Sequence, residues 1–354
     1  MDATTSARTT VEGLTRFIEQ ALAACGVVPA QAQIAAEVLA TTDSWGVFTH
    51  GSKLLSGYVR RLRKGGLRTD AEPRVAAEGP AWALVDGESV LGQAAAAFAM
   101  RQAIAKARAT GIGYVGVRNS CHFGAAGYYA WMAAREGLIG MAMANDVPSV
   151  AAPGSRRAVL GSNPLAYAIP AERHPPILLD ISIATVAGGK VYARRRRGEP
   201  IPPDWLIGPD GRPTVDGSLY PQEAALAPMG GHKGYGLGLL IETLSAVATG
   251  AAVTHRVGSW MFDDGTRPTD HGAALLAIDA ACLAGDGQFL RRVDALIDEL
   301  HAAPAAEGSP GVLVPGELEW RRRAAALQEG LDFPEDVRSV LREVADELAL
   351  DPPC

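Results

Sequence analysis

The spacing of apolar residues predicts that the chain begins with helices. Between Val11 and Cys25, apolar side chains recur at steps of three and one residues, which is the stripe of an amphipathic helix. Two more helices are expected, at residues 29–42 and after His50 up to the Gly65-Gly66 pair, because glycine commonly ends a helix. The first 75 residues are therefore predicted to be a helical segment.

Beyond residue 75 the periodicity changes to short apolar runs that are typical of strands. The expected strands cover residues 82–85, 114–117, 139–143, 165–169, 177–181 and 274–278. Helical stretches are expected between them, over residues 92–109, 125–135, 236–248 and 289–301. Residues 200–228 and 302–310 have no periodicity and are rich in turn-forming residues, which indicates long surface excursions.

This order of elements predicts a mixed α/β (α+β) protein. We expect a mixed α/β body over residues 76–317, which binds cofactor and substrate. The helical segment 1–75 is expected to pack with C-terminal helices of residues 318–354 as a second domain. The strand spacing is too irregular for a barrel.

Composition and charge exclude several classes of protein. Hydrophobic residues make up 48% of the chain and charged residues 20%, which predicts a compact globular protein. With 33 Lys and Arg against 39 Asp and Glu, the net charge of -6 repels phosphate backbones, so nucleic acid is not an expected partner. The start has no secretory signal, and no apolar run is long enough to span a membrane, so we expect a cytoplasmic protein without membrane contact.

Cysteine and histidine usage gives no sign of a metal site. The cysteines are isolated from one another and are interpreted as reduced thiols; they are Cys25, Cys121, Cys282 and Cys354. The histidines show no ligand spacing such as HExxH. No metal is therefore expected.

One glycine motif matches a dinucleotide-binding loop in letters only. Gly111, Gly113 and Gly116 follow the G-x-G-x-x-G pattern. That loop binds pyrophosphate only when a strand precedes it and a helix follows, because the helix N-terminus supplies the amide donors. Here a predicted helix precedes and a strand follows, so these glycines are interpreted as the end of a helix.

A second glycine-rich stretch is a better candidate for an anion site. Residues 230–238, GGHKGYGLG, lead directly into an apolar helix. Free amide groups of the first helical turn and the charge of Lys233 suit a phosphate. It is not a Walker loop, because Lys233 is followed by Gly234. On pattern alone, phosphate binding and a plain flexible turn both stay open.

Two histidines occupy positions typical of functional side chains. His50 lies at the junction of two predicted helices, in DSWGVFTHG. His122 lies in NSCHFG, directly after a predicted strand and before a helix. A hydrogen-bonded structural histidine is the alternative for each of them.

Six motifs in one order resemble the malate/L-lactate dehydrogenase family. They are THG at His50, NSCHFG at His122, GSNPLAYAIP at 161–170, LDIS at 179–182, GGHKGYGLGLLIE at 230–242 and VPGE at 314–317. The family includes L-sulfolactate and ureidoglycolate dehydrogenases and Δ1-piperideine-2-carboxylate reductase. The resemblance spans nearly the whole chain. It implies a non-Rossmann fold, an NAD(H) or NADP(H) cofactor, and a homodimer with active sites near the subunit interface.

The resemblance also implies roles for individual residues. His122 matches the general acid/base and His50 a second proton-handling histidine, with Thr49 beside it and Tyr58 in the substrate pocket. Asn163 is expected either to bind substrate or cofactor amide, or to form a turn. The positions that match cofactor contacts are Asp146, Asp180, Ile181, Ser182, His232, Lys233, Pro315, Gly316 and Glu317.

Two departures from the family pattern concern the substrate. Leu54 stands where relatives often carry an arginine suited to gripping a carboxylate, and the neighbouring Lys53 is turned about 100° away around a helix. Trp45 also stands where relatives often have arginine. These departures argue against a dicarboxylate substrate such as malate.

The sequence thus predicts an NAD(P)-dependent oxidoreductase that interconverts a small 2-oxo acid and its 2-hydroxy acid. A histidine that titrates near neutrality suits the proton transfer at the substrate oxygen. The alternatives are reduction of a cyclic imino acid, and a catalytically inactive dimeric binding protein. The choice between NAD and NADP stays open.

Overall fold

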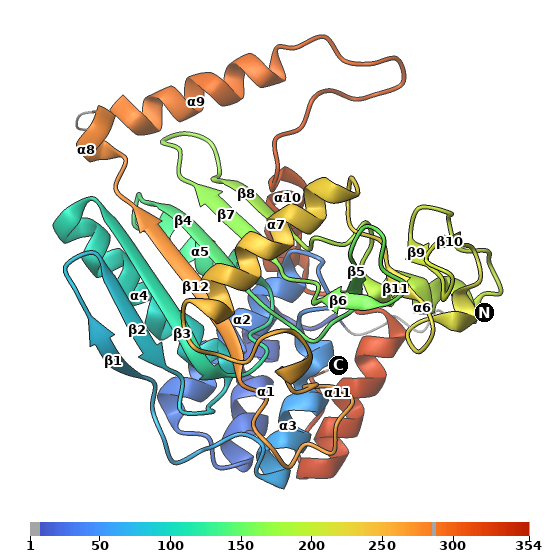
Figure 1. The fold of residues 1–354 in the computed structure, drawn as a ribbon. Coiled ribbons are helices and arrows are strands. Elements are labelled where there is room, and N and C mark those ends of the chain that lie inside the picture. The colour runs from blue at the N-terminus through green and yellow to red at the C-terminus, as the bar shows by residue number, and fades with distance from the viewer. Residues whose placement is uncertain (1–7, 285–287, 354) are drawn as a thin grey trace, which may run out of the picture.

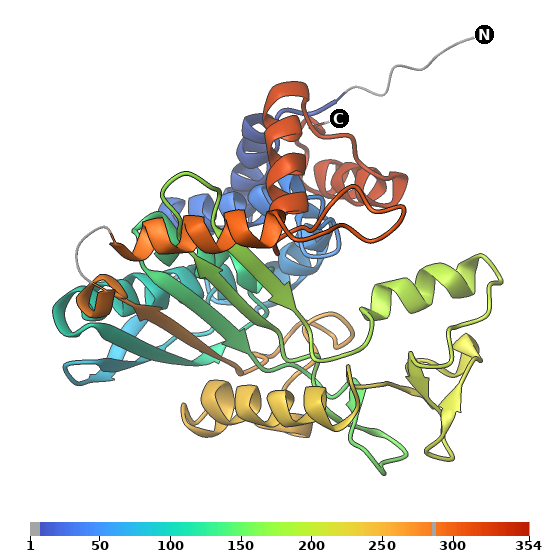
Figure 2. The same cartoon turned by 90° about the horizontal axis from the view of Figure 1, so that it is seen from above.

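A computed structural model describes residues 8–284 and 288–353, and a large mixed sheet forms its centre (Figure 1). Helices α4 and α5 pack on one face of this sheet and α7 lies on the other (Figure 2). The mixed α/β prediction is confirmed. The expectation of no secretory signal falls partly on residues 1–7, and that of a reduced thiol on Cys354. These residues lie outside the described ones.

Most of the helices lie where the periodicity predicts them, whereas those at residues 188–196 and 281–284 were not predicted. The α-helices of the described residues are α1 (Val11–Ala24), α2 (Pro29–Ser44), α3 (Leu55–Lys64), α4 (Gly92–Thr110), α5 (Ala126–Arg135), α6 (Gly188–Arg196), α7 (His232–Glu242), α8 (Ala281–Ala284), α9 (Gln288–His301), α10 (Glu317–Glu329) and α11 (Glu335–Leu348). Short turns of other helix types are η1 (Ser52–Leu54), η2 (Gly217–Leu219), η3 (Thr243–Val247, a π-helical turn) and η4 (Thr254–Arg256).

The large sheet has the strand order β1-β2-β3-β12-β4-β7-β8. Its strands are β1 (Arg74–Glu78), β2 (Trp82–Asp86), β3 (Ile112–Ser120), β4 (Ile139–Ala144), β7 (Leu165–Ile169), β8 (Ile177–Ile181) and β12 (His271–Ile278). Only the β2–β3 pair is parallel among these described neighbours. Strand β12 lies between β3 and β4 although it is the last strand among the described residues, so it brings His271 beside Ser120 and Ala273 beside Ala144.

A smaller sheet forms beside α7 and α6. Its order is β10-β9-β11-β5-β6, with β5 (Val150–Ala151), β6 (Ala158–Leu160), β9 (Leu206–Ile207), β10 (Pro213–Thr214) and β11 (Ala225–Leu226). These strands have only two or three residues, too few for a hydrophobic alternation to be visible in the sequence. The excursion at residues 200–228 therefore contains strands that the sequence did not predict. Residues 302–310 contain no helix or strand, as expected.

The N- and C-terminal segments lie against each other. Thr9 and Leu331 form an antiparallel bridge, and Arg63 on α3 pairs with Glu347 on α11 at 2.7 Å. One hydrophobic cluster includes Leu14, Val115 and Leu341, so it runs from these helices into the large sheet. The division into two domains at residue 75 stays a prediction.

The rejected dinucleotide motif is a helix end, as predicted. Gly111 follows the last residue of α4 with φ +88°, a left-handed conformation that glycine adopts at little cost, and β3 begins at the next residue. The element that follows Gly111 is a strand, so no helix N-terminus comes after it to supply amide donors. A Rossmann pyrophosphate loop is therefore absent at this position.

Within residues 8–284 and 288–353, no helix combines the length and apolar character that a membrane span requires. The same residues contain no cluster of three or more side chains suited to hold a metal ion. Cys25, Cys121 and Cys282 are free thiols.

Candidate active site

Three neighbouring strands of the large sheet bring polar residues to one edge. Strand β3 ends at Ser120, which pairs with His271 at the start of β12, while Ala144 at the end of β4 pairs with Ala273. Because β12 is antiparallel to both neighbours, the end of β3, the start of β12 and the end of β4 meet at the same edge. His122, His271 and Asp146 thus come together from distant parts of the chain.

His50 joins this edge from the helical segment. Its ring centroid lies 5.9 Å from that of His122, with 31° between the planes. The Nδ1 atom of His50 is 3.0 Å from Oγ1 of Thr49. The structure therefore brings together the two histidines that the sequence singled out separately.

The loop that carries His50 is anchored by a buried carboxylate. Asp43, 1% exposed, accepts a hydrogen bond at Oδ2 from the Ser52 amide at 2.9 Å. A Cβ atom on Gly51 would overlap Oδ1 of Asp43, so only glycine lets the loop approach this closely. Burial raises the pKa of the Asp43 carboxyl to about 7.

His122 is held by aromatic neighbours. The hydroxyl of Tyr58 lies 2.8 Å from Nδ1 of His122, and the Gly124 amide donates to the same nitrogen at 3.3 Å. Trp260 stacks on His122 at a centroid distance of 4.3 Å and on Tyr58 at 5.3 Å. Tyr58 is only 1% exposed, so its side chain supports His122 from behind.

The surroundings favour neutral imidazoles. Both histidine rings keep some solvent exposure, but the dense packing around them lowers the pKa of His122 to about 3 and also lowers the pKa of His50. The charge of Asp146 opposes this shift at both rings, and His271 adds to it at His122.

Asp146 belongs to a hydrogen-bonded pair. Its Oδ1 lies 3.1 Å from Nε2 of His271 and accepts from the Val147 amide at 2.8 Å. The other ring nitrogen of His271, which is 3% exposed, lies 2.9 Å from Oγ1 of Thr269, and that hydroxyl donates to the carbonyl of Ser120 at 3.2 Å. Since the hydroxyl hydrogen is used, Nδ1 of His271 donates to it, and the pairing with His271 lowers the pKa of the Asp146 carboxyl against the opposing effect of burial.

His50, Tyr58, His122, Asp146, Trp260 and His271 are called the histidine site below. Sequence reasoning missed His271 and Trp260. His271 begins a strand and Trp260 lies in an irregular segment, and neither carries a motif. Only the pairing of β12 with β3 would have revealed His271.

Asn163 does not reach this surface. It is 0% exposed, and its Nδ2 donates to Oε2 of Glu242 at 2.9 Å and to the carbonyl of Gly238 at 3.2 Å. Its φ of +35° is unusual for a side-chain-bearing residue. The turn interpretation of Asn163 agrees with this position better than ligand contact does.

Two of the expected cofactor stretches meet along β8, an edge strand of the large sheet. Asp180 accepts a hydrogen bond from the Gly127 amide at 2.7 Å, at the start of α5, and Ile181 and Ser182 follow it with partly exposed side chains. At the other half of β8, the Leu178 amide donates to the carbonyl of Pro315 at 2.9 Å.

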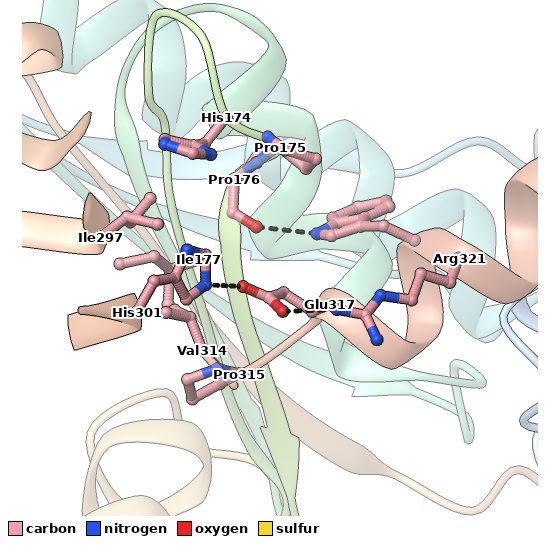
Figure 3. Close-up of a pocket in the computed structure, with 11 residues that line it drawn as sticks. His174, Pro175, Pro176, Ile177, Ile297, His301, Val314, Pro315, Glu317 and Arg321 are labelled. Atoms are coloured by element: carbon pink, nitrogen blue, oxygen red, sulfur yellow. Dashed lines mark hydrogen bonds and ion pairs between the residues drawn. The ribbon is translucent and has the colours of Figure 1, made fainter. Parts of the chain in front are cut away.

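A cavity of about 240 Å³ lies beside this half of β8 (Figure 3). Its lining includes Pro315 and Glu317. Glu317 lies between His301, with which it forms a hydrogen bond, and Arg321, whose guanidinium is 3.1 Å away. Pro315 and Glu317 thus combine an apolar surface with a fixed carboxylate at a site large enough for a flat ring.

The third expected stretch begins α7. His232 and Lys233 are exposed, and the Met229 amide donates to the carbonyl of Ile183 at 2.8 Å, which places this turn beside the end of β8. Gly230 and Gly231 have φ of +56° and +64°, and a Cβ on Gly231 would meet nothing within 4 Å. An open helix N-terminus next to a lysine suits the pyrophosphate of a nicotinamide cofactor. Residues 180–182, 232–233 and 315–317 are called the cofactor track below.

Comparison with known proteins finds similarity over most of the chain. The family model of malate/L-lactate dehydrogenases matches residues 9–342. L-sulfolactate dehydrogenase of Methanocaldococcus jannaschii is 34% identical over 339 residues, which are 95% of each chain. Ureidoglycolate dehydrogenase (NAD(+)) of Escherichia coli O157:H7 is 33% identical over 93% of each chain. Delta(1)-pyrroline-2-carboxylate/Delta(1)-piperideine-2-carboxylate reductase of Pseudomonas putida is 31% identical over 90% of this chain and 91% of its own.

A solved structure shares the fold. The sulfolactate dehydrogenase structure from Methanocaldococcus jannaschii superposes with a TM-score of 0.90 at 33% identity, and the match covers 98% of both chains. The similarity therefore extends over the helical segments, the large sheet and the smaller sheet together.

Proposed function

The chain belongs to the malate/L-lactate dehydrogenase family, and from this premise we propose that it transfers a hydride between NAD(H) or NADP(H) and a small 2-oxo or 2-hydroxy acid. The observation that carries the proposal is the facing pair of His50 and His122, 5.9 Å apart at one sheet edge. Two imidazoles from separate segments converge where a substrate oxygen needs a hydrogen-bond donor and a proton donor.

The cofactor track fits a nicotinamide dinucleotide. Asp180, Ile181 and Ser182 would hold it at the end of β8, His232 and Lys233 at its pyrophosphate, and Pro315, Gly316 and Glu317 at its far end. Strand β8 spans about 16 Å at about 3.3 Å per residue, so an elongated cofactor can follow it from the start of α5 to the cavity beside Glu317. When bound, the nicotinamide ring supplies or accepts the hydride.

The protein's own residues handle the proton and the orientation of the substrate. In the reductive direction the carbonyl oxygen gains the electron pair of its double bond and takes a proton from an imidazole of the histidine site. In the oxidative direction the same imidazole removes the hydroxyl proton. Thr49, 3.0 Å from Nδ1 of His50, is proposed to orient that ring and to face the substrate.

The residues around the histidines argue against a dicarboxylate substrate. Leu54 is buried where a carboxylate-binding arginine would stand. Lys53 does not replace it, because its ammonium group pairs with Asp336 on α11 at 2.5 Å. A second substrate carboxylate buried beside Leu54 would lack the two-pronged hydrogen bonding of a guanidinium, and its burial would be costly.

One observation favours a second candidate function, reduction of a cyclic imino acid. Asp146 is fixed as an anion by His271 and contributes to the electrostatics of both catalytic histidines. A carboxylate at this place stabilises a protonated imine nitrogen, whereas it offers nothing to a neutral ketone oxygen. A side-by-side assay of both substrate classes separates the two functions.

We also propose a homodimer in the cytoplasm. Helix α7 and the turn η3 expose Leu237, Leu240 and Val247 by 38%, 54% and 58%, an apolar surface that a second copy would cover. The free thiols Cys25, Cys121 and Cys282 agree with a reducing compartment.

The deciding experiment measures oxidation of NADH and NADPH by the purified protein with a panel of 2-oxo acids and with Δ1-piperideine-2-carboxylate. Turnover of 2-oxo acids is expected, and turnover of the cyclic imine alone would favour the second candidate. Thermal stabilisation by either cofactor without any turnover would instead identify an inactive binding protein.

A further inference from the structure

We infer that Tyr58 is a positioning residue that fixes the tautomer of His122. In this arrangement His122 presents Nε2–H to the substrate as a neutral hydrogen-bond donor, and His50 delivers the proton. The inference rests on the proposed function for the substrate and assigns different tasks to the two histidines. It follows from the partners of one ring nitrogen.

The partners of Nδ1 decide where the hydrogen of His122 sits. The Gly124 backbone amide is 3.3 Å from Nδ1 and can only donate, so Nδ1 must be an acceptor. The Tyr58 hydroxyl, 2.8 Å from the same atom, then donates as well. A neutral imidazole that accepts at Nδ1 carries its hydrogen on Nε2.

The ring has little freedom to change this arrangement. Trp260 stacks on it with an interplanar angle of 15° and also stacks on Tyr58 with 18°, which restrains both rings, whose planes are 30° from each other. A hydrogen on Nδ1 would point at the hydrogen of the Gly124 amide. This geometry opposes the imidazolium form in addition to burial, in agreement with the pKa of about 3 for His122.

Tyr58 cannot supply the proton through His122. Burial raises the pKa of its phenol well above 10, and it is 1% exposed, so the tyrosinate form is strongly disfavoured. Tyr58 therefore donates a hydrogen bond and keeps its proton.

The surroundings of His50 allow both protonation states of its ring, unlike those of His122. Its Nδ1 faces the Thr49 hydroxyl, which can accept from a protonated nitrogen or donate to a bare one. The ring is partly exposed, so it can regain a proton from solvent. The groups whose charges act on the two rings are Asp146, which favours protonation of both, and His271 and His50, which oppose protonation of His122.

The proton and electron balance then follows. As hydride bonds to the carbonyl carbon, the electron pair of the C=O double bond moves to the oxygen, which Nε2–H of His122 stabilises. The oxygen takes a proton from the His50 imidazolium, leaving a hydroxy acid and a neutral His50. A solvent proton restores His50, and His122 keeps its hydrogen throughout.

The test uses Tyr58→Phe, which keeps the stacked ring and removes only the donor, in protein labelled with ¹⁵N-histidine. In the unmodified enzyme His122 is expected to show the Nε2–H tautomer without titration between pH 5 and pH 8. In Tyr58→Phe we expect His122 to titrate at higher pH and kcat for reduction to fall about tenfold, as for loss of one hydrogen bond of about 1.4 kcal/mol. Tyr114→Phe is the matched control, because its hydroxyl donates to the carbonyl of Leu244 at 2.8 Å, away from the site.

A separate measurement, the pH profile of the reduction rate, tests whether His50 donates the proton. His50 must be protonated to donate, so the fall of the reduction rate with rising pH should belong to His50 and should disappear in His50→Gln. Titration of His122 in this pH range in the unmodified enzyme, or an unchanged His122 spectrum in Tyr58→Phe, would overturn the inference. The ¹⁵N spectra are recorded without turnover, so they test whether Tyr58 fixes the tautomer of His122 even if the proposed reaction is wrong.

Discussion

The histidine site and the cofactor track are built in different ways. The histidine site gathers residues from six separate segments, and its orienting contacts are partly buried: Tyr58 contacts His122 across 64 residues of sequence, and Asp146 contacts His271 across 125. The cofactor track consists of short contiguous stretches at the end of β8 and the starts of α7 and α10, with side chains that are mostly exposed or partly exposed. The first arrangement provides rigidity for chemistry, and the second provides backbone groups for binding.

This difference predicts that chemistry and cofactor binding can be lost separately. The largest effect is expected for His122→Ala, which removes the hydrogen-bond donor at the substrate oxygen. Because a positioned acid/base or donor group contributes about 10²- to 10⁴-fold, kcat should fall about a thousandfold. The Kd for NAD(P)H, measured by fluorescence titration, should stay within about twofold. His255→Ala, on the exposed turn η4, is the control. A parallel loss of cofactor affinity would mean that the two regions are one unit.

Substitution of Asp146 is expected to change selectivity more than rate. Asp146→Asn keeps a hydrogen-bonding oxygen near His271 but removes the negative charge. We expect the ratio of kcat/KM for a cyclic imine to kcat/KM for a 2-oxo acid to fall about tenfold or more, because one charge contact at an intermediate dielectric is worth a few kcal/mol at most. Asp210→Asn, on an exposed turn, is the control. If the ratio stays constant, Asp146 does not contact the substrate side of the site.

A substitution in the cofactor track is expected to change the KM for the cofactor and to leave kcat nearly unchanged. Lys233→Ala removes an exposed charge at the start of α7, where the pyrophosphate is proposed to bind. The KM for NAD(P)H is expected to rise about tenfold, the scale of one charge-assisted hydrogen bond, with kcat nearly unchanged. The matched control is Lys64→Ala in the last turn of α3. A fall in kcat with constant KM would place Lys233 in the chemistry instead.

The same contrast explains how far the sequence could predict this protein. Long amphipathic helices such as α1 and strands such as β7 follow from hydrophobic periodicity, although β1 was not predicted. Contiguous motifs singled out His50, His122 and the cofactor track. Strands β5, β6, β9, β10 and β11 are too short to show a period. His271 and Trp260 become visible only through strand pairing and stacking, which depend on the folded arrangement of segments far apart in the chain.

The smallest effect is expected at Asp43, the buried carboxyl that anchors the loop carrying His50. The pKa of Asp43 rises from 3.8 to about 7 because burial disfavours the charged form. The folded state therefore holds this proton more tightly than the unfolded state between about pH 4 and pH 7, and the free energy of unfolding falls as pH rises through that window. Asp43→Asn should remove this fall, whose upper limit is about 1.4 kcal/mol per pH unit.

Thermal unfolding at pH 5 and pH 8 measures the difference. The Tm of Asp43→Asn is compared with that of the unmodified protein at each pH. The difference, variant minus unmodified, should be more positive at pH 8 than at pH 5 by a few degrees. Asp351→Asn, near the exposed C-terminal end of the described residues, should show no such dependence on pH. Equal Tm differences at both pH values would mean that Asp43 is ionised throughout this range, so that the loop carrying His50 rests on a buried anion and not on a group that titrates near neutrality.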